Sequence, residues 1–240
     1  MADLFGEVVY PSSRAFWTED DGENGEAGDD TVSFTIDWIE TCPEKMKTLI
    51  IAETPLIKDF IEKCVIQDHK CICNIKSPNK KESSRIHQLP NDLFLCLVDP
   101  EVNLTIAGDF IEAISPILSK SENTIAITCN HVSQLKCGEK TPELSFMRSL
   151  STRAVSEKQR KFFSVLSQPN IVAGVAAGAI AYAEVMDLPG TLAVLYLDGF
   201  ELDSTSAEPL IKLFKELLSY DLKDFHVASS LFLEKGNLYM

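Results

Sequence analysis

The sequence lacks the features that mark a fibrous, disordered or exported protein. Its 240 residues are 45% hydrophobic and include only 11 Gly and 11 Pro. This is too much apolar material for a disordered chain and too little glycine for a collagen-like one. Near the start, Asp3 stands where a secretory signal needs basic residues, and Gly6 and Glu7 interrupt the apolar run. We therefore expect a globular protein without a signal peptide.

Basic residues are scarce. The chain has 22 Lys and Arg against 36 Asp and Glu, which gives a formal net charge of -14. Because phosphate groups repel so acidic a surface, the composition predicts neither nucleic-acid binding nor binding to an anionic membrane. The longest stretch of small apolar residues, 171–186, contains Glu184 and is too short to cross a bilayer. We expect a cytoplasmic protein, with the nucleus as a second location.

The common catalytic motifs are absent from the sequence. It contains no G-x-S-x-G, no G-x-G-x-x-G, no G-x-x-x-x-G-K-[ST] and no H-E-x-x-H. We therefore predict no catalytic residues, no cofactor and no metal. Two alternatives stay open: an α/β enzyme acting on a small molecule such as a nucleoside, and an adaptor that binds other partners.

The seven cysteines are an odd number and read as reduced thiols. Cys71 and Cys73 could present two thiolates on one side of a strand, but no further pair is spaced like zinc ligands, so both are interpreted as core residues. Cys129 and His131 lie close in sequence at a strand end. Catalytic Cys–His pairs usually meet through the fold, so this pair is interpreted as non-catalytic.

Half of the net charge lies in one short segment. Residues 18–30 (TEDDGENGEAGDD) hold seven acids and no base. Such a stretch cannot bury a face, and its charges repel one another, which predicts a disordered linker. The expected organisation is therefore an N-terminal apolar cluster with this linker (1–30), one folded domain (31–226) and a C-terminal tail (227–240).

Apolar patterns of period two alternate with helical stripes between residues 31 and 226. We expect the following elements: strands near 31–38, 47–52, 71–75, 92–98, 124–129 and 191–197, and helices near 55–67, 105–118, 171–186 and after a cap at Asp203 or Ser204. Residues 76–90 read as a mobile loop, and 138–170 as irregular with a short helix near 157–166. Gly174 and Gly178 are spaced for close packing of their helix on the sheet. The pattern predicts a single α/β domain whose mainly parallel or mixed sheet is covered by helices.

Both chain ends carry apolar residues outside the predicted domain. Residues 3–9 (DLFGEVV) form a cluster cut off by the acidic segment, and it either docks or frays. At the other end, Leu238–Tyr239–Met240 combines an apolar side chain, a ring with one hydroxyl and a terminal carboxylate that can pair with a lysine. This tripeptide is the predicted partner-binding site, although Tyr239 on a final strand of the domain's own core is the alternative.

Five segments, in order, resemble the proteasome assembly chaperone 1 family. They are LFGEVV (4–9), TIAITCNHV (124–132), FMRSL (146–150), SQPNIV (167–172) continuing into AAGAIAYAEVMDLPGTLAVLYLD (176–198), and NLYM (237–240). The segment 40–120 contains no family motif. Ala173–Gly174–Val175 stands where the family has Leu-Pro.

The resemblance implies a non-catalytic scaffold. It implies pairing with a second chaperone of similar structure, proteasome assembly chaperone 2. It further implies that the heterodimer promotes assembly of the proteasome α-ring, discourages α-ring dimers and occupies the face on which activators dock. The hydrophobic–Tyr–x tail, Leu238–Tyr239–Met240 here, is implied to enter a pocket between α-ring subunits.

Overall fold

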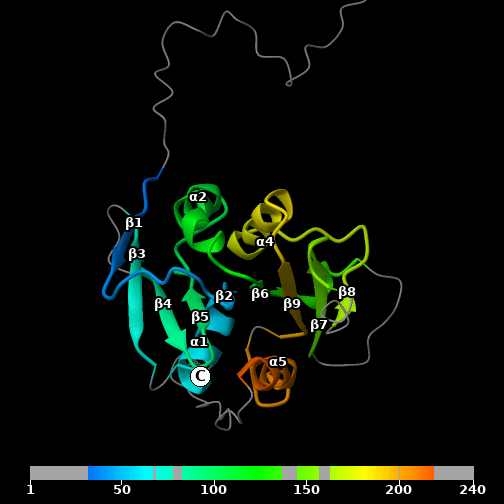
Figure 1. The fold of residues 1–240 in the computed structure, drawn as a ribbon. Helices are drawn as coiled ribbons and strands as arrows, with labels where there is room; N and C mark the ends of the chain where they lie inside the picture. The colour runs from blue at the N-terminus through cyan, green and yellow to red at the C-terminus, as the bar shows by residue number, and fades with distance from the viewer. Residues whose placement is uncertain are drawn as a thin grey trace, which may run out of the picture. The chain divides into compact units, whose positions relative to one another are not determined.

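A single mixed sheet of nine strands forms the centre of the protein (Figure 1). The computed structural model describes residues 32–66, 69–77, 83–136, 145–156, 163–199 and 201–218. The strand order is β1-β3-β4-β5-β2-β6-β9-β7-β8. The strands are β1 (Thr35–Trp38), β2 (Thr48–Ala52), β3 (Cys71–Lys76), β4 (Ser83–Leu89), β5 (Leu93–Leu97), β6 (Thr124–His131), β7 (Ser145–Ser151), β8 (Ser164–Val165) and β9 (Gly190–Leu197).

The middle of the sheet is parallel. β2 pairs in parallel with β5 and β6, and β6 pairs in parallel with β9. All five residues of β2 and of β5 are buried. Helices cover both faces of such strands, which explains why their sequences TLIIA and LFLCL are continuous apolar runs rather than alternating ones. The predicted α/β class with a mixed sheet is therefore confirmed.

The segment 76–90, predicted as a mobile loop, contains strand β4, so that prediction was wrong. β4 pairs antiparallel with both β3 and β5, and its residues Ser84, Ile86 and His87 are buried. Asn91 and Asp92 have φ of 64° and 56° in the turn to β5. These residue types tolerate left-handed backbone, which closes the hairpin. The sequence SSRIHQL is rich in polar residues, so its pattern did not predict a strand that pairs on both sides.

The segment 138–170, predicted to be irregular, contains β7, so that interpretation was also wrong. β7 pairs antiparallel with β9 along seven residues, from Ser145 opposite Leu197 to Ser151 opposite Thr191. A short helix was predicted near 157–166; residues 157–162 lie outside the described residues, and β8 follows at Ser164–Val165. Serines and Arg148 interrupt the apolar pattern of β7, which explains why periodicity missed it.

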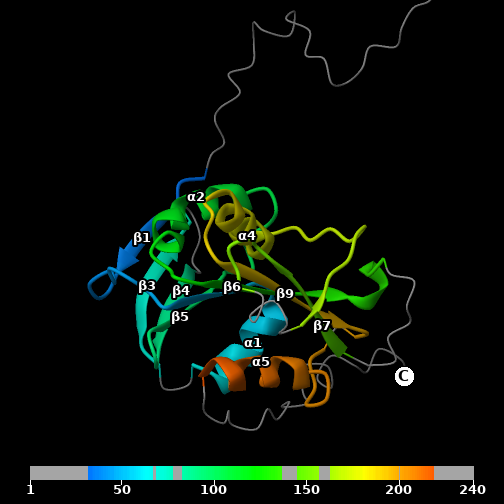
Figure 2. The ribbon, with the colours of Figure 1, turned by 45° about the vertical axis from the view of Figure 1, so that its right-hand side comes forward.

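The helices form two layers, one on each face of the sheet (Figures 1 and 2). Among the described residues they are α1 (Pro55–Cys64), α2 (Ala107–Leu118), α4 (Val175–Val185) and α5 (Glu208–Leu218). α2 and α4 lie side by side and enclose one apolar cluster with the sheet. α1 and α5 enclose a second cluster on the opposite face. The core is therefore double, with the sheet between its halves.

The helix boundaries follow local chemistry. In the turn before α5, Asp203 Oδ1 accepts a hydrogen bond from the Ser206 N–H at 2.6 Å, while the helix itself begins at Glu208, later than the cap predicted at Asp203 or Ser204. Hydrogen bonds from Ser206 hold the pKa of the Asp203 carboxyl below its ordinary value. α4 begins at Val175 rather than at 171, because Gly174 (φ 103°) breaks the helical backbone. No helix in the described part of the chain is long and apolar enough to cross a membrane.

Candidate interaction surface

The predicted docking tail, Leu238–Tyr239–Met240, lies outside the described residues, which end at Leu218. The N-terminal cluster 3–9 and the acidic segment 18–30 also lie outside them. Their predicted roles therefore stay predictions. The other candidate sites, which involve the strand cysteines and His131, lie within the described residues.

The two strand cysteines of β3 belong to or border the core. Cys73 is buried, and Cys71 is half-buried with its thiol 3.5 Å from the Cys73 carbonyl oxygen. Burial, assisted by the neighbouring thiols Cys71 and Cys42, raises the pKa of Cys73 to about 12. Cys73 is therefore a neutral core residue, as predicted. Over the ranges that the structure describes, no three His, Cys, Asp or Glu side chains gather as metal ligands do.

Cys129 and His131 each contact other residues. The Cys129 thiol lies 3.2 Å from the Thr54 hydroxyl. The His131 ring nitrogens contact Ser133 Oγ at 2.8 Å and the Asp198 carbonyl oxygen at 3.1 Å. Burial raises the pKa of the Cys129 thiol, whereas a nucleophilic cysteine needs a lowered one. This geometry agrees with the non-catalytic interpretation of both residues.

The carboxyl ends of the parallel strands are the usual place for a ligand in an α/β fold. Here Glu53, which follows β2, occupies the start of α4 itself. Its carboxylate accepts the backbone N–H of Val175 at 2.8 Å and of Ala176 at 3.1 Å. A β-carbon at Gly174 would lie 2.4 Å from Glu53 Oε1. The position at which a substrate phosphate would bind a helix N-terminus is thus filled by the protein's own carboxylate.

The glycine spacing in α4 serves contacts other than those predicted. We expected Gly174 and Gly178 to allow close packing on the sheet. A β-carbon at Gly178 would instead lie 3.0 Å from Ile111 Cγ1 of α2. Gly178 therefore lets two neighbouring helices approach, and Gly174 makes room for the Glu53 carboxylate.

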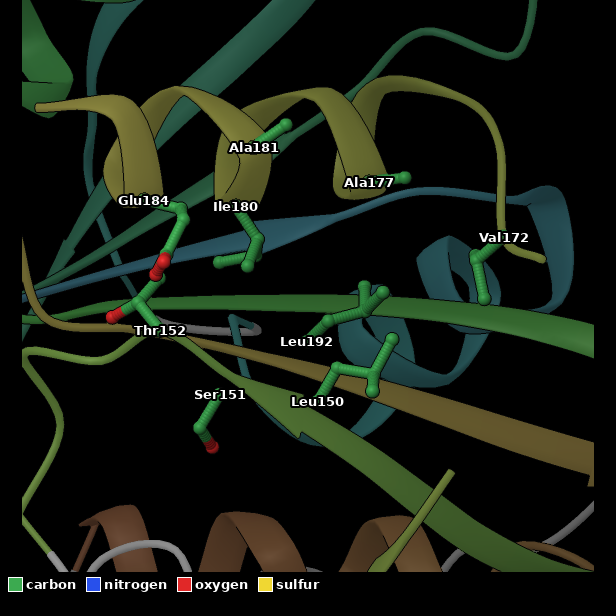
Figure 3. Close-up of a pocket in the computed structure, with 9 residues that line it drawn as sticks. All are labelled: Leu150, Ser151, Thr152, Val172, Ala177, Ile180, Ala181, Glu184 and Leu192. Carbon is green, nitrogen blue, oxygen red and sulfur yellow. The ribbon is translucent and has the colours of Figure 1, made fainter. Parts of the chain in front are cut away.

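A shallow apolar groove lies between α4 and the sheet (Figure 3). Its volume is about 290 Å³. Ile180 of α4 points down towards Leu192 of β9 and Leu150 of β7, which lie opposite each other in the sheet. Val172 lies at one end of the groove, and at the other Glu184 accepts the Arg153 backbone N–H at 2.8 Å and the Arg153 Nε–H at 2.6 Å. Aliphatic side chains form most of the lining, Ser151 and Thr152 add hydroxyl groups, and the charged Glu184 lies at one end.

The outer side of α4 continues this apolar area. Ala181 is exposed, and the Val185 side chain one turn further is 82% exposed. Beside the helix, Leu150 is 36% exposed. We call Leu150, Val172, Ala177, Ala181 and Val185 the α4 surface. Sequence reasoning treated this helix as a packing element and missed its exposed side; the available signal was that only Glu184 is charged in VAAGAIAYAEV.

The sheet with its two helix layers is a fold that solved structures share. It is the fold of the archaeal proteasome activator PbaB of Pyrococcus furiosus, with a TM-score of 0.60 over 80% of this chain and 91% of that one, at 13% identity. At this identity the likeness concerns the fold alone.

The sequence places the chain within a family. Residues 70–232, more than half of the chain, match the PAC1 family, described as Proteasome assembly chaperone 4. The chain belongs to this family, which confirms the resemblance to proteasome assembly chaperones.

Sequence relatives carry the name Proteasome assembly chaperone 1. The mouse protein is 35% identical over 102 residues, covering 42% of this chain and 33% of the relative. The Nematostella vectensis protein is 22% identical over 224 residues, covering 85% of this chain and 83% of the relative. The match to the mouse protein thus spans about a third of that relative's length.

Proposed function

We propose that the protein is a non-catalytic chaperone that pairs with a second chaperone of similar structure, proteasome assembly chaperone 2, and promotes assembly of the proteasome α-ring. The observation that carries this proposal is the family match over residues 70–232. The exposed apolar α4 surface supports it, because uncovered apolar area of this kind marks protein partners. The proposed locations are the cytoplasm and the nucleus.

The proposed contact with the ring is made by Leu238, Tyr239 and the carboxylate of Met240. Apolar burial of the first two side chains and pairing of the carboxylate with a lysine would together stabilise the complex. The net charge of -14 supports an approach to lysine-lined pockets. The tail has about 14 residues after His226, and an extended chain spans at most ~3.3–3.6 Å per residue, so its end can reach a neighbouring particle.

Reconstitution tests the chaperone role. The chain and its partner are added to co-expressed α subunits, and single rings and ring dimers are quantified by native mass spectrometry. We expect more single rings and fewer dimers than without the chaperones. Unchanged proportions with a folded chaperone pair would contradict the proposal.

A substitution in the tail tests whether Tyr239 binds the α-ring. Tyr239→Ala should weaken binding to the α-ring by about tenfold or more, with an unchanged melting temperature and unchanged pairing with the second chaperone. If Tyr239 instead fills the domain's own core, the same change should lower stability by about 3 kcal/mol or more. Intact folding with unchanged ring affinity would overturn the docking assignment.

A further inference from the structure

α4 is apolar on its outer side as well as its inner side. Val175, Ala176 and Ala179 are buried against the sheet and α2, while Ala181 and Val185 face outward. A helix that is apolar all round is normally covered on every side. Small side chains on the outer face also let a second helix approach closely. The α4 surface therefore has the composition of a packed interface rather than of a solvated face.

Acids outnumber bases around this surface. The helices α2 and α4, with the two residues that follow each, carry the four acids Asp109, Glu112, Glu184 and Asp187 and one base, Lys120. Arg148 of β7, two residues before Leu150, adds a base on the same face of the sheet. Arg153, from the loop after β7, is ion-paired with Glu184 at 2.6 Å. A second copy of this chain would bring the same acids to the interface, and each copy carries an overall net charge of -14. Charge repulsion thus disfavours a homodimer and favours a partner with basic residues around an apolar centre.

The groove in the α4 surface is small, open and mainly aliphatic. Its volume of about 290 Å³ lies at the lower limit of the ~300–1,000 Å³ typical of small-molecule sites. Leu150, Val172 and Ile180 line it with aliphatic carbon. A single large apolar side chain inserted here would be surrounded by α4 on one side and by β7 and β9 below (Figure 3).

We propose that the α4 surface is the face on which the second assembly chaperone docks, by placing an apolar side chain in the groove and basic residues opposite Glu112 and Asp187. This inference rests on the proposed pairing and adds the surface and the chemistry of the partner. The occupant is a different chain of similar fold, with a basic rim around its own apolar centre.

Charge insertion on α4 tests the surface. Ala181→Glu and Val185→Glu place a carboxylate on exposed positions, so the fold should tolerate them, as circular dichroism melting checks. The matched control is Ile39→Glu, at a 56% exposed position just after β1, the far edge strand of the sheet. We expect each α4 variant to weaken binding to the purified second chaperone at least tenfold, and the control to change it less than twofold.

Glu112→Lys tests the charge argument on the full-length chain. Reversing this exposed acid of α2 should slow association with the second chaperone severalfold, and raising the salt concentration should slow wild-type association while narrowing the difference. An association rate that is independent of both the variant and the salt would overturn the assignment of a basic partner rim.

Hydrogen exchange of the wild-type pair separates the two proposals. Protection of residues 171–187 on pairing supports the assignment. Pairing with protection elsewhere, and with normal binding by the α4 variants, overturns the surface but leaves the proposed function standing. Absence of pairing overturns both, and tight self-association of this chain through 171–187 overturns the choice of a different partner.

Discussion

The two faces of the sheet are covered by helices of different character. α1 and α5 each carry four charged residues of both signs, whereas α2 carries two acids and α4 only Glu184. The first pair shows the ordinary stripe of a surface helix, apolar inward and charged outward. α2 and α4 also bury apolar side chains against the sheet, but their exposed sides carry few charged residues. The same sheet thus supports one face whose helices are charged outward and one whose helices carry few charges, and the second is the face that we propose for the partner.

The largest effects are expected from cavities in the two halves of the core, and we expect them to be of similar size on the two faces. Phe60 of α1 and Phe110 of α2 are both 0% exposed, in the clusters on opposite faces. Phe60→Ala and Phe110→Ala should each lower the free energy of unfolding by about 3–5 kcal/mol, because both leave a cavity. Urea denaturation measures this. A cost below about 1 kcal/mol for Phe110→Ala alone would contradict a tightly packed α2–α4 layer.

Gly174→Ala should have the next largest effect, because it disturbs the start of α4 in two ways. The backbone at Gly174 has φ of 103°, and the new β-carbon would displace the Glu53 carboxylate. We expect a loss of about 2–4 kcal/mol in thermal or urea unfolding. The matched control is Gly108→Ala in α2, where a β-carbon meets nothing within 4 Å. That change should stabilise by about 0.5–1 kcal/mol, and a similar loss at both sites would contradict the role given to Glu53.

A pH effect is expected on the α1 side. Burial lowers the pKa of His87, whose Nδ1 lies 3.3 Å from the His69 carbonyl oxygen, and the Arg85 charge lowers it further while Glu62 and the His69 hydrogen bond oppose this shift. A lowered pKa means that the unfolded chain binds the proton more readily. Stability from neutral His87 is therefore full above about pH 6.5 and is lost as the pH falls through the folded-state pKa.

The measurement for His87 is urea unfolding between pH 8 and pH 5. Wild-type stability should fall over this window, and His87→Leu should fall less steeply. Parallel pH profiles for the two proteins would assign the dependence to other groups.

The smallest effect is expected on the exposed side of α4. Val185→Ser removes an apolar side chain that already faces solvent, so the free energy of unfolding should change by no more than about 0.5 kcal/mol. Thermal unfolding of the isolated chain checks this. A loss above about 1 kcal/mol would show that the side chain supports the fold and would remove the contrast between the two faces.

The sequence was most informative where burial is complete. TLIIA, LFLCL and TLAVLYL are continuous apolar runs, and each is a central strand. The apolar stripes of α1 and α5 likewise predicted these two helices, with ends within a few residues of the observed ones. Pro55 at the first turn of α1 marked a start that local chemistry decides, and Asp203 marked the turn that precedes α5.

The strands β4 and β7 were missed because their pattern depends on distant partners. His87 and Ser84 are buried although they are polar, because β4 lies between β3 and β5 under the helices. Ser149 is buried at 3% exposure between β8 and β9. When only neighbours in sequence are considered, polar residues at such positions predict a loop.

The sequence alone determined the acidic charge, the central strands, the amphipathic helices and the family resemblance, because each depends on residue types and local spacing. Only the tertiary structure decided which side of α4 faces outward, since that depends on where α2, β7 and β9 lie around it. Tertiary contacts also placed Glu53 at the start of α4, 122 residues away in sequence. Local periodicity carries no information about contacts of that length, and the α4 surface arises from them.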